Sequence, residues 1–89
     1  MTEIAKRRAI RRLRLIAGQI RGLERMVERD AYCIHIIHQS HAIQEALSSF
    51  EAFMLEHHLK THVIQQIKAG EERKAIREIL SICKLSKRA

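Results

Sequence analysis

The 89-residue sequence contains no proline, no tryptophan, only three glycines and only three aromatic residues. Sheets need β-branched and aromatic runs separated by turn residues at regular spacing, so these shortages argue against strands and favour long helices. The sequence also lacks a run of 18 apolar residues, and an acidic residue rather than an apolar segment follows shortly after Met1. We therefore expect a cytoplasmic protein with neither a membrane span nor a secretory signal.

Only two cysteines are present, Cys33 and Cys83. In the cytoplasm both are expected as thiols rather than as a disulfide. Cys83 lies on the apolar side of a helix predicted over residues 71–85, and we expect a packed thiol without a metal role there. Cys33 has a different setting, because it begins a segment that is rich in histidine.

Basic residues outnumber acidic residues by 17 to 10, and the excess is uneven along the chain. Residues 1–30 carry nine basic and four acidic side chains, whereas residues 31–70 carry two basic and three acidic ones. A basic N-terminal element followed by a nearly neutral middle suits a polyanion such as DNA. The alternative is a basic helix face that only contacts solvent.

Residues 3–29 have the clearest periodicity in the sequence. Their apolar residues alternate spacings of four and three, which is typical of a helical packing seam. The seam consists of Ala9, Leu13, Ile16, Ile20, Leu23 and Val27. The other side and its flanks carry what we call the arginine face, defined as Arg7, Arg8, Arg11, Arg12, Arg14 and Arg21. Guanidinium groups make forked contacts with phosphate, so the arginine face is the predicted DNA-binding surface.

Residues 33–62 contain neither glycine nor proline and are predicted to form one helix. At about 100° per residue, His58 and His62 each fall within roughly 20° of the direction of Cys33, so the three residues share one stripe. The separation of 25 positions between Cys33 and His58 corresponds to about 37 Å of helix, so a single straight helix does not bring them to one ion. Two copies packed antiparallel would bring Cys33 of one chain to the two histidines of the other.

The rest of the helical pattern predicts an all-α fold. Asp30 is expected to end the first helix region and to act as N-cap of the second helix, in a short link typical of antiparallel helices, and Gly70 is the natural end of the second helix. We expect one domain over residues 1–89 with three helices per chain. A chain this short buries little core by itself, so we expect an antiparallel helical dimer.

Three segments of the chain resemble a known family. They are R-R-L-R-L-I-A-G-Q-I-R-G-L-E-R-M at residues 11–26, D-A-Y-C at 30–33 and H-H-L-K-T-H at 57–62. They resemble the copper-sensing operon repressors and their nickel- and cobalt-sensing relatives, the CsoR/RcnR type. The resemblance implies a tetramer built from two dimers, which binds operator DNA when metal-free and leaves it when metal binds. It implies three metal ligands, Cys33, His58 and His62.

The residues around these ligands bear on the choice of ion. His62 stands where copper sensors of the family carry a second cysteine, and this matches the Cys-His-His pattern of the nickel and cobalt sensors. Those relatives add an N-terminal histidine, which residues 1–5 lack. Tyr32 and Glu78 match residues that copper sensors place around the ion, and His57 is the other histidine expected to touch the site. One thiolate with two imidazoles suits three-coordinate Cu(I), so we predict Cu(I), with Ni(II), Co(II) or Zn(II) as alternatives.

The resulting interpretation is a metal-responsive transcriptional repressor whose partners are operator DNA and further copies of itself. A nickel- or cobalt-sensing repressor and a helical metal-buffer protein without a regulatory role are the alternatives. We do not expect an enzyme, since the ligand set lacks a paired carboxylate at catalytic spacing. Neither a membrane partner nor a small organic substrate is expected.

Overall fold

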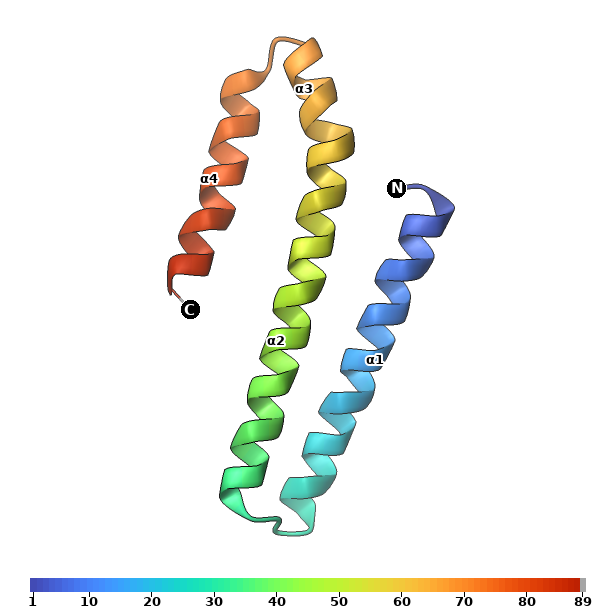
Figure 1. The fold of residues 1–89 in the computed structure, drawn as a ribbon, viewed down its shortest axis with the longest axis vertical. Coiled ribbons are helices and arrows are strands. Elements are labelled where there is room, and N and C mark those ends of the chain that lie inside the picture. The colour runs from blue at the N-terminus through green and yellow to red at the C-terminus, as the bar shows by residue number, and fades with distance from the viewer. Residues whose placement is uncertain (89) are drawn as a thin grey trace. The chain divides into compact units, whose positions relative to one another are not determined.

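The computed structural model describes the backbone of residues 1–88 and the side chains of residues 1–85; Ala89, the end of the predicted domain, lies outside this part. Its elements are α1 (Glu3–Glu28), α2 (Cys33–His58), the π-helical turn η1 (Leu59–Val63), α3 (Ile64–Lys68) and α4 (Glu72–Arg88) (Figure 1). Residues 1–88 contain no strand, which confirms the all-α prediction. In the described part of the chain, every helix is too short or too polar to cross a membrane. The chain divides into two compact units, Met1–Leu55 and Glu56–Ala89, and the prediction of one domain stays a prediction.

The first helix begins at a side-chain cap. Thr2 has an extended backbone, with φ −67° and ψ 159°, and its hydroxyl accepts a hydrogen bond from the Ala5 N–H at 3.2 Å. This bond satisfies one of the amides that have no partner in the first turn of a helix. Glu3 in the first turn and Arg25 in the last turn complement the helix dipole. Local chemistry therefore favours both ends of α1.

In the unit Met1–Leu55, α1 lies beside the first part of α2 and runs in the opposite direction (Figure 1). Ala9 and Ile16 of α1 and Ile43 of α2 are buried, and the first two are predicted seam positions. A polar contact crosses the same pair of helices. The Arg12 guanidinium donates a hydrogen bond to Ser49 Oγ at 3.2 Å, and its carbon lies 4.9 Å from the centre of the Phe53 ring.

The turn between α1 and α2 depends on Asp30, which ends α1 rather than beginning α2. Its φ is 56°, in the left-handed region. The Asp30 and Ala31 amides donate to the carbonyls of Val27 and Met26, which is the bonding pattern of a Schellman motif. The second helix starts only at Cys33. The prediction that Asp30 caps α2 is therefore wrong, because a short polar side chain suits a left-handed helix end as well as an N-cap.

In the unit Glu56–Ala89, the second helix continues through a wider turn. His58 and Ile64, the residues that flank η1, both have right-handed helical dihedrals, so α2, η1 and α3 are continuous. Gly70, with φ 78°, ends this helix as predicted. The chain then reverses and α4 packs along α3 (Figure 1), with Val63 and Ala75 buried. The third predicted helix, 71–85, corresponds to α4.

A single chain leaves much of its apolar surface uncovered. Leu13, Ile20 and Val27 of the α1 seam are 42%, 49% and 57% exposed, and Ile76 and Leu80 of α4 are more than half exposed. Side chains at seam spacing normally lie against another helix. This exposure is what the predicted dimer would cover, although the dimer itself stays a prediction.

Candidate functional site

Two of the predicted metal ligands lie together at the π turn. His58 is the last residue of α2, and His62 lies within η1. The centres of their imidazole rings are 5.2 Å apart, and the ring planes differ by 29°. The pair therefore has its rings side by side, as the spacing of one helical turn predicts.

The π turn also brings His57 against this pair. A π turn holds more residues than an α turn, so a residue comes back near the residue five positions earlier. His57 and His62 have this spacing, and their ring centres are 6.4 Å apart with the planes at 73°. His57 thus contacts a predicted ligand, and its role at a metal site stays a prediction. The π turn itself was not predicted, because neither glycine nor proline marks it in the sequence.

Thr61 connects the backbone of this turn to the side chain of a predicted ligand. Its hydroxyl donates a hydrogen bond to the carbonyl oxygen of His57 at 2.8 Å. The hydroxyl oxygen of Thr61 also lies 3.2 Å from Nδ1 of His62. Sequence reasoning missed Thr61. The available signal was its residue type, since threonine in a helix often bonds to the carbonyl four residues earlier.

Glu78 reaches the histidine pair from α4. Its Oε2 lies 3.5 Å from Nε2 of His58, and the two side chains are 40% and 29% exposed respectively. A carboxylate beside one ring nitrogen orients an imidazole and leaves the other nitrogen for a metal ion. The structure thus places Glu78 beside a predicted ligand, where the family resemblance implied it.

A further charged pair lies on the surface next to the histidines. Lys60 Nζ is 2.8 Å from Glu56 Oε1, and both side chains are largely exposed. The hydrogen bond from Lys60, together with its positive charge, lowers the pKa of Glu56. Glu56 is therefore an ionised carboxylate whose partner is Lys60, and we do not assign it to the group of histidines.

The third predicted ligand and its neighbour lie in the other unit. Cys33 is the first residue of α2, and its thiol is exposed. The ring of Tyr32 lies edge-on to His35, with ring centres 5.6 Å apart. Among the described residues, no three His, Cys, Asp or Glu side chains form a group that could hold a metal ion.

The chemistry of the donors nevertheless fits a transition-metal ion. Two adjacent imidazoles and an exposed thiol provide nitrogen and sulfur, which Cu(I), Zn(II), Ni(II) and Co(II) prefer to the oxygen donors of Mg²⁺ or Ca²⁺. Cys83 is also exposed in the described chain. It was predicted as a packed thiol, and the described chain does not pack it. Cys83 follows Leu80, which is also exposed, by three residues, so packing of this side of α4 would need a partner.

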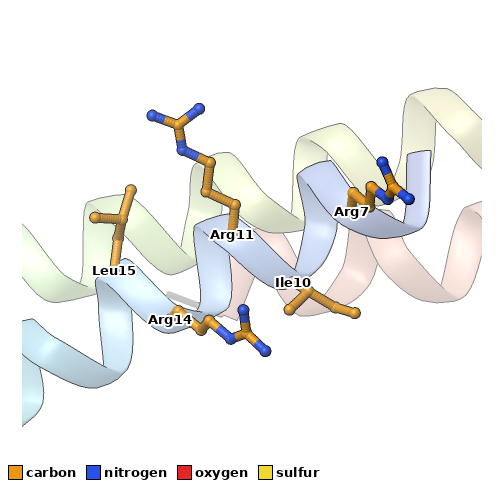
Figure 2. Close-up of a pocket in the computed structure, with 5 residues that line it drawn as sticks. All are labelled: Arg7, Ile10, Arg11, Arg14 and Leu15. Carbon is orange, nitrogen blue, oxygen red and sulfur yellow. The ribbon is translucent and has the colours of Figure 1, made fainter. Parts of the chain in front are cut away.

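Part of the arginine face borders a shallow groove on α1. Arg7, Arg11 and Arg14 follow spacings of four and three residues and line this groove with Ile10 and Leu15. Figure 2 shows the three arginines along this stretch of α1, with the guanidinium group of Arg11 extending away from the helix backbone. Exposed cationic groups repeated along one helix suit a polyanionic backbone better than a small ligand.

The arginines of this face differ in their contacts with other side chains. Arg8 and Arg21, which lie outside the groove, are exposed. Arg7 lies 3.5 Å from Glu3, but both side chains are more than two-thirds exposed, and such pairs contribute little to stability. Arg12 differs from the others because its guanidinium already contacts Ser49 and Phe53. Its predicted DNA contact remains a prediction.

Comparison with known proteins adds independent information. The family model described as metal-sensitive transcriptional repressor matches residues 5–84. The copper-sensing transcriptional repressor CsoR of Bacillus subtilis (strain 168) is 41% identical over 73 residues, which are 82% of this chain and 72% of that protein. The protein of the same name from Mycobacterium bovis (strain BCG / Pasteur 1173P2) is 35% identical over 81 residues, 91% of this chain and 68% of that protein. A crystal structure of the copper-sensing repressor CsoR with Cu(I) from Geobacillus thermodenitrificans NG80-2 matches with a TM-score of 0.91 and 34% identity. It covers 98% of this chain and 91% of that chain.

Proposed function

This chain belongs to the metal-sensitive transcriptional repressor family, and from that premise we propose that it is a cytoplasmic copper-responsive repressor. It binds operator DNA when metal-free and leaves the DNA when Cu(I) binds. The ion is held by Cys33 of one chain and by His58 and His62 of another. The family is one of repressors, which favours this function over an unregulated metal buffer.

One observation carries the proposal. The chain matches a repressor that was crystallised with Cu(I) over 98% of its own length, at a TM-score of 0.91. Several relatives at 35–41% identity are themselves copper-sensing repressors. A likeness of this extent, with histidines already adjacent in the matching fold, supports a shared mode of sensing.

Sharing the site between two chains follows from where the donors lie. Cys33 begins α2, whereas His58 ends it and His62 follows in η1. No group of three candidate ligands forms within the described residues of one chain. An antiparallel pair of chains would complete two equivalent sites at once, because a two-fold axis repeats every contact. The uncovered seam of α1 supplies apolar surface for such a pair, and two pairs would form the proposed tetramer.

Cu(I) is the ion that this donor set serves best. It is soft, it prefers thiolate and imidazole, and three donors satisfy it. Glu78 beside Nε2 of His58 would orient that imidazole for the ion. Bound Cu(I) would supply no chemistry of its own here beyond linking the two chains through their donors.

Metal and DNA then act on one equilibrium between two states. The metal-free state presents the arginine face to phosphate, and the metal-bound state presents it less well. Metal and DNA must weaken each other's binding by the same factor, and such couplings are typically about 1–3 kcal/mol. The groove bordered by Arg7, Arg11 and Arg14 is the surface that we assign to the DNA backbone.

Release of operator DNA during an anaerobic metal titration tests the function. Fluorescence anisotropy of labelled operator is measured while Cu(I) is added to the metal-free protein, and Cys33→Ala serves as the matched control. We expect stoichiometric release for the wild type and none for the control, with X-ray absorption showing three-coordinate Cu(I). Binding that persists at saturating Cu(I) would contradict the proposal.

One observation favours a second candidate, a nickel- or cobalt-sensing repressor. His57 adds a third imidazole 6.4 Å from His62, and Ni(II) and Co(II) need more donors than Cu(I). The same titration is therefore repeated with Ni(II), Co(II) and Zn(II). Release by Ni(II) or Co(II) at lower free-metal concentration than Cu(I), with a six-coordinate spectrum, would favour this candidate.

A further inference from the structure

We propose that Thr61 is a positioning residue that holds His62 in the tautomer with hydrogen on Nδ1, so that Nε2 is the nitrogen offered to metal. The inference rests on the proposed function for its consequence, since His62 is a ligand only in that account. The tautomer itself is a property of the metal-free chain. It follows from the geometry of three groups within the unit Glu56–Ala89.

The argument depends on the single hydrogen of the Thr61 hydroxyl. That hydrogen is donated to the carbonyl oxygen of His57, which lies 2.8 Å away and can only accept. The hydroxyl oxygen then has only lone pairs to offer to its second neighbour, Nδ1 of His62 at 3.2 Å. A hydrogen bond between them therefore requires hydrogen on Nδ1. A neutral imidazole carries one hydrogen, so Nε2 keeps its lone pair.

These three groups meet at the π turn. A π turn shifts the backbone hydrogen-bond register by one residue, and the carbonyls at its start change partners. His57 supplies its carbonyl two residues before the turn, while Thr61 and His62 lie inside it. One hydroxyl thus bonds the backbone of the turn and fixes the nitrogen that His62 presents. The shape of the turn and the tautomer are coupled.

The two predicted histidine ligands would then be oriented through different nitrogens. Glu78 lies beside Nε2 of His58, whereas Thr61 lies beside Nδ1 of His62. Each contact leaves the opposite nitrogen of its ring for metal. Loss of the Thr61 hydroxyl should therefore change which nitrogen of His62 carries the hydrogen and should leave the hydrogen of His58 in place.

The experiment reads the tautomer directly in the metal-free protein. Two-bond ¹H–¹⁵N correlation spectra, recorded at a pH where imidazoles are neutral, assign the protonated nitrogen of His62. Wild type is compared with Thr61→Val, which keeps the shape and removes the hydroxyl, and with Thr61→Ser, which restores the hydroxyl. Thr2→Val is the control, because Thr2 is the other threonine of the chain and caps α1.

We expect hydrogen on Nδ1 of His62 in wild type, Thr61→Ser and Thr2→Val, and its loss from Nδ1 in Thr61→Val. Cu(I) affinity should fall about tenfold in Thr61→Val and recover in Thr61→Ser, the usual effect of removing a group that orients a ligand. Operator binding by the metal-free protein should not change. Hydrogen on Nε2 in the wild type would overturn the inference, and that result needs no variant to fold. If Cu(I) fails to release DNA from the wild type, the proposed function fails, while the spectra still decide the role of Thr61.

Discussion

Two residues set the helix ends on which the turns depend. Asp30 and Gly70 both have left-handed backbones, with φ of 56° and 78°. In each case the following amide bonds back to a carbonyl in the last turn of the preceding helix. Glycine adopts this conformation without steric strain, whereas residues with a Cβ do so at a cost.

Gly70→Ala should lower the free energy of unfolding by about 1 kcal/mol, because strain in the left-handed region is the main change. A Cβ at this position meets no heavy atom within 4 Å, so crowding does not contribute. Asp30→Gly is the matched opposite and should raise the free energy of unfolding by about 0.5 kcal/mol. Urea unfolding of the three proteins measures both values. Equal stability of Gly70→Ala and wild type would contradict the assigned backbone.

At the same scale, sequence alone predicted the histidines but not how they are held. Spacing placed His58 and His62 on one stripe, and their rings are indeed adjacent. No residue type marks the register shift of η1, and the one signal for the bond between Thr61 and the His57 carbonyl was the tendency of a helical threonine to bond four residues back. Such details depend on backbone hydrogen bonds, which a pattern of side chains does not specify.

The pairing of α1 with α2 gives two arginines of the arginine face different roles. Arg14 is exposed and lines the groove on α1 shown in Figure 2. Arg12 instead bonds to Ser49 and lies over Phe53. A guanidinium held against a neighbouring helix contributes to packing, and this limits its contact with phosphate.

Arg14→Ala should make the plot of the logarithm of the operator-binding constant against the logarithm of the salt concentration less steep. The magnitude of the slope should fall by about 0.9, because one phosphate contact is lost. Its free energy of unfolding should match the wild type. Arg12→Ala should lower the free energy of unfolding by about 1 kcal/mol, from the lost cation–π contact and hydrogen bond, and should change the slope less. Operator titrations across a salt series, with urea unfolding in parallel, separate the two effects. A full slope change without loss of stability in Arg12→Ala would assign Arg12 to DNA instead.

Periodicity was sufficient to predict the elements, and it failed where one residue type serves two purposes. The seam over residues 3–29 corresponds to α1, and Gly70 ends α3 as expected. Asp30 ends the first helix as expected, but its predicted role as N-cap of the second helix was wrong, because aspartate is favoured both at N-caps and in left-handed turns. The choice between these positions depends on hydrogen bonds at the turn rather than on composition.

At the scale of the whole molecule, one described chain is incomplete in two respects. The α1 seam is exposed at Leu13, Ile20 and Val27. The predicted ligand set is also divided, with Cys33 at the start of α2 and His58 at its end. Helical spacing in the sequence predicted both features, but a single chain does not show which surfaces meet. Under the proposal, a second copy of the chain would both cover the α1 seam and complete the metal site.

The central claim is that one metal ion is bound by two copies of the chain, and complementation between variants tests it most directly. Cys33→Ala and His58→Ala are mixed, subunit exchange is confirmed by native mass spectrometry, and anaerobic Cu(I) binding is measured. Mixing either variant with the double variant is the control. We predict that neither variant alone binds Cu(I) tightly, whereas each mixed dimer regains one intact site, because the remaining Cys33 and His58 belong to different chains. Confirmed exchange without any return of Cu(I) binding would contradict the claim.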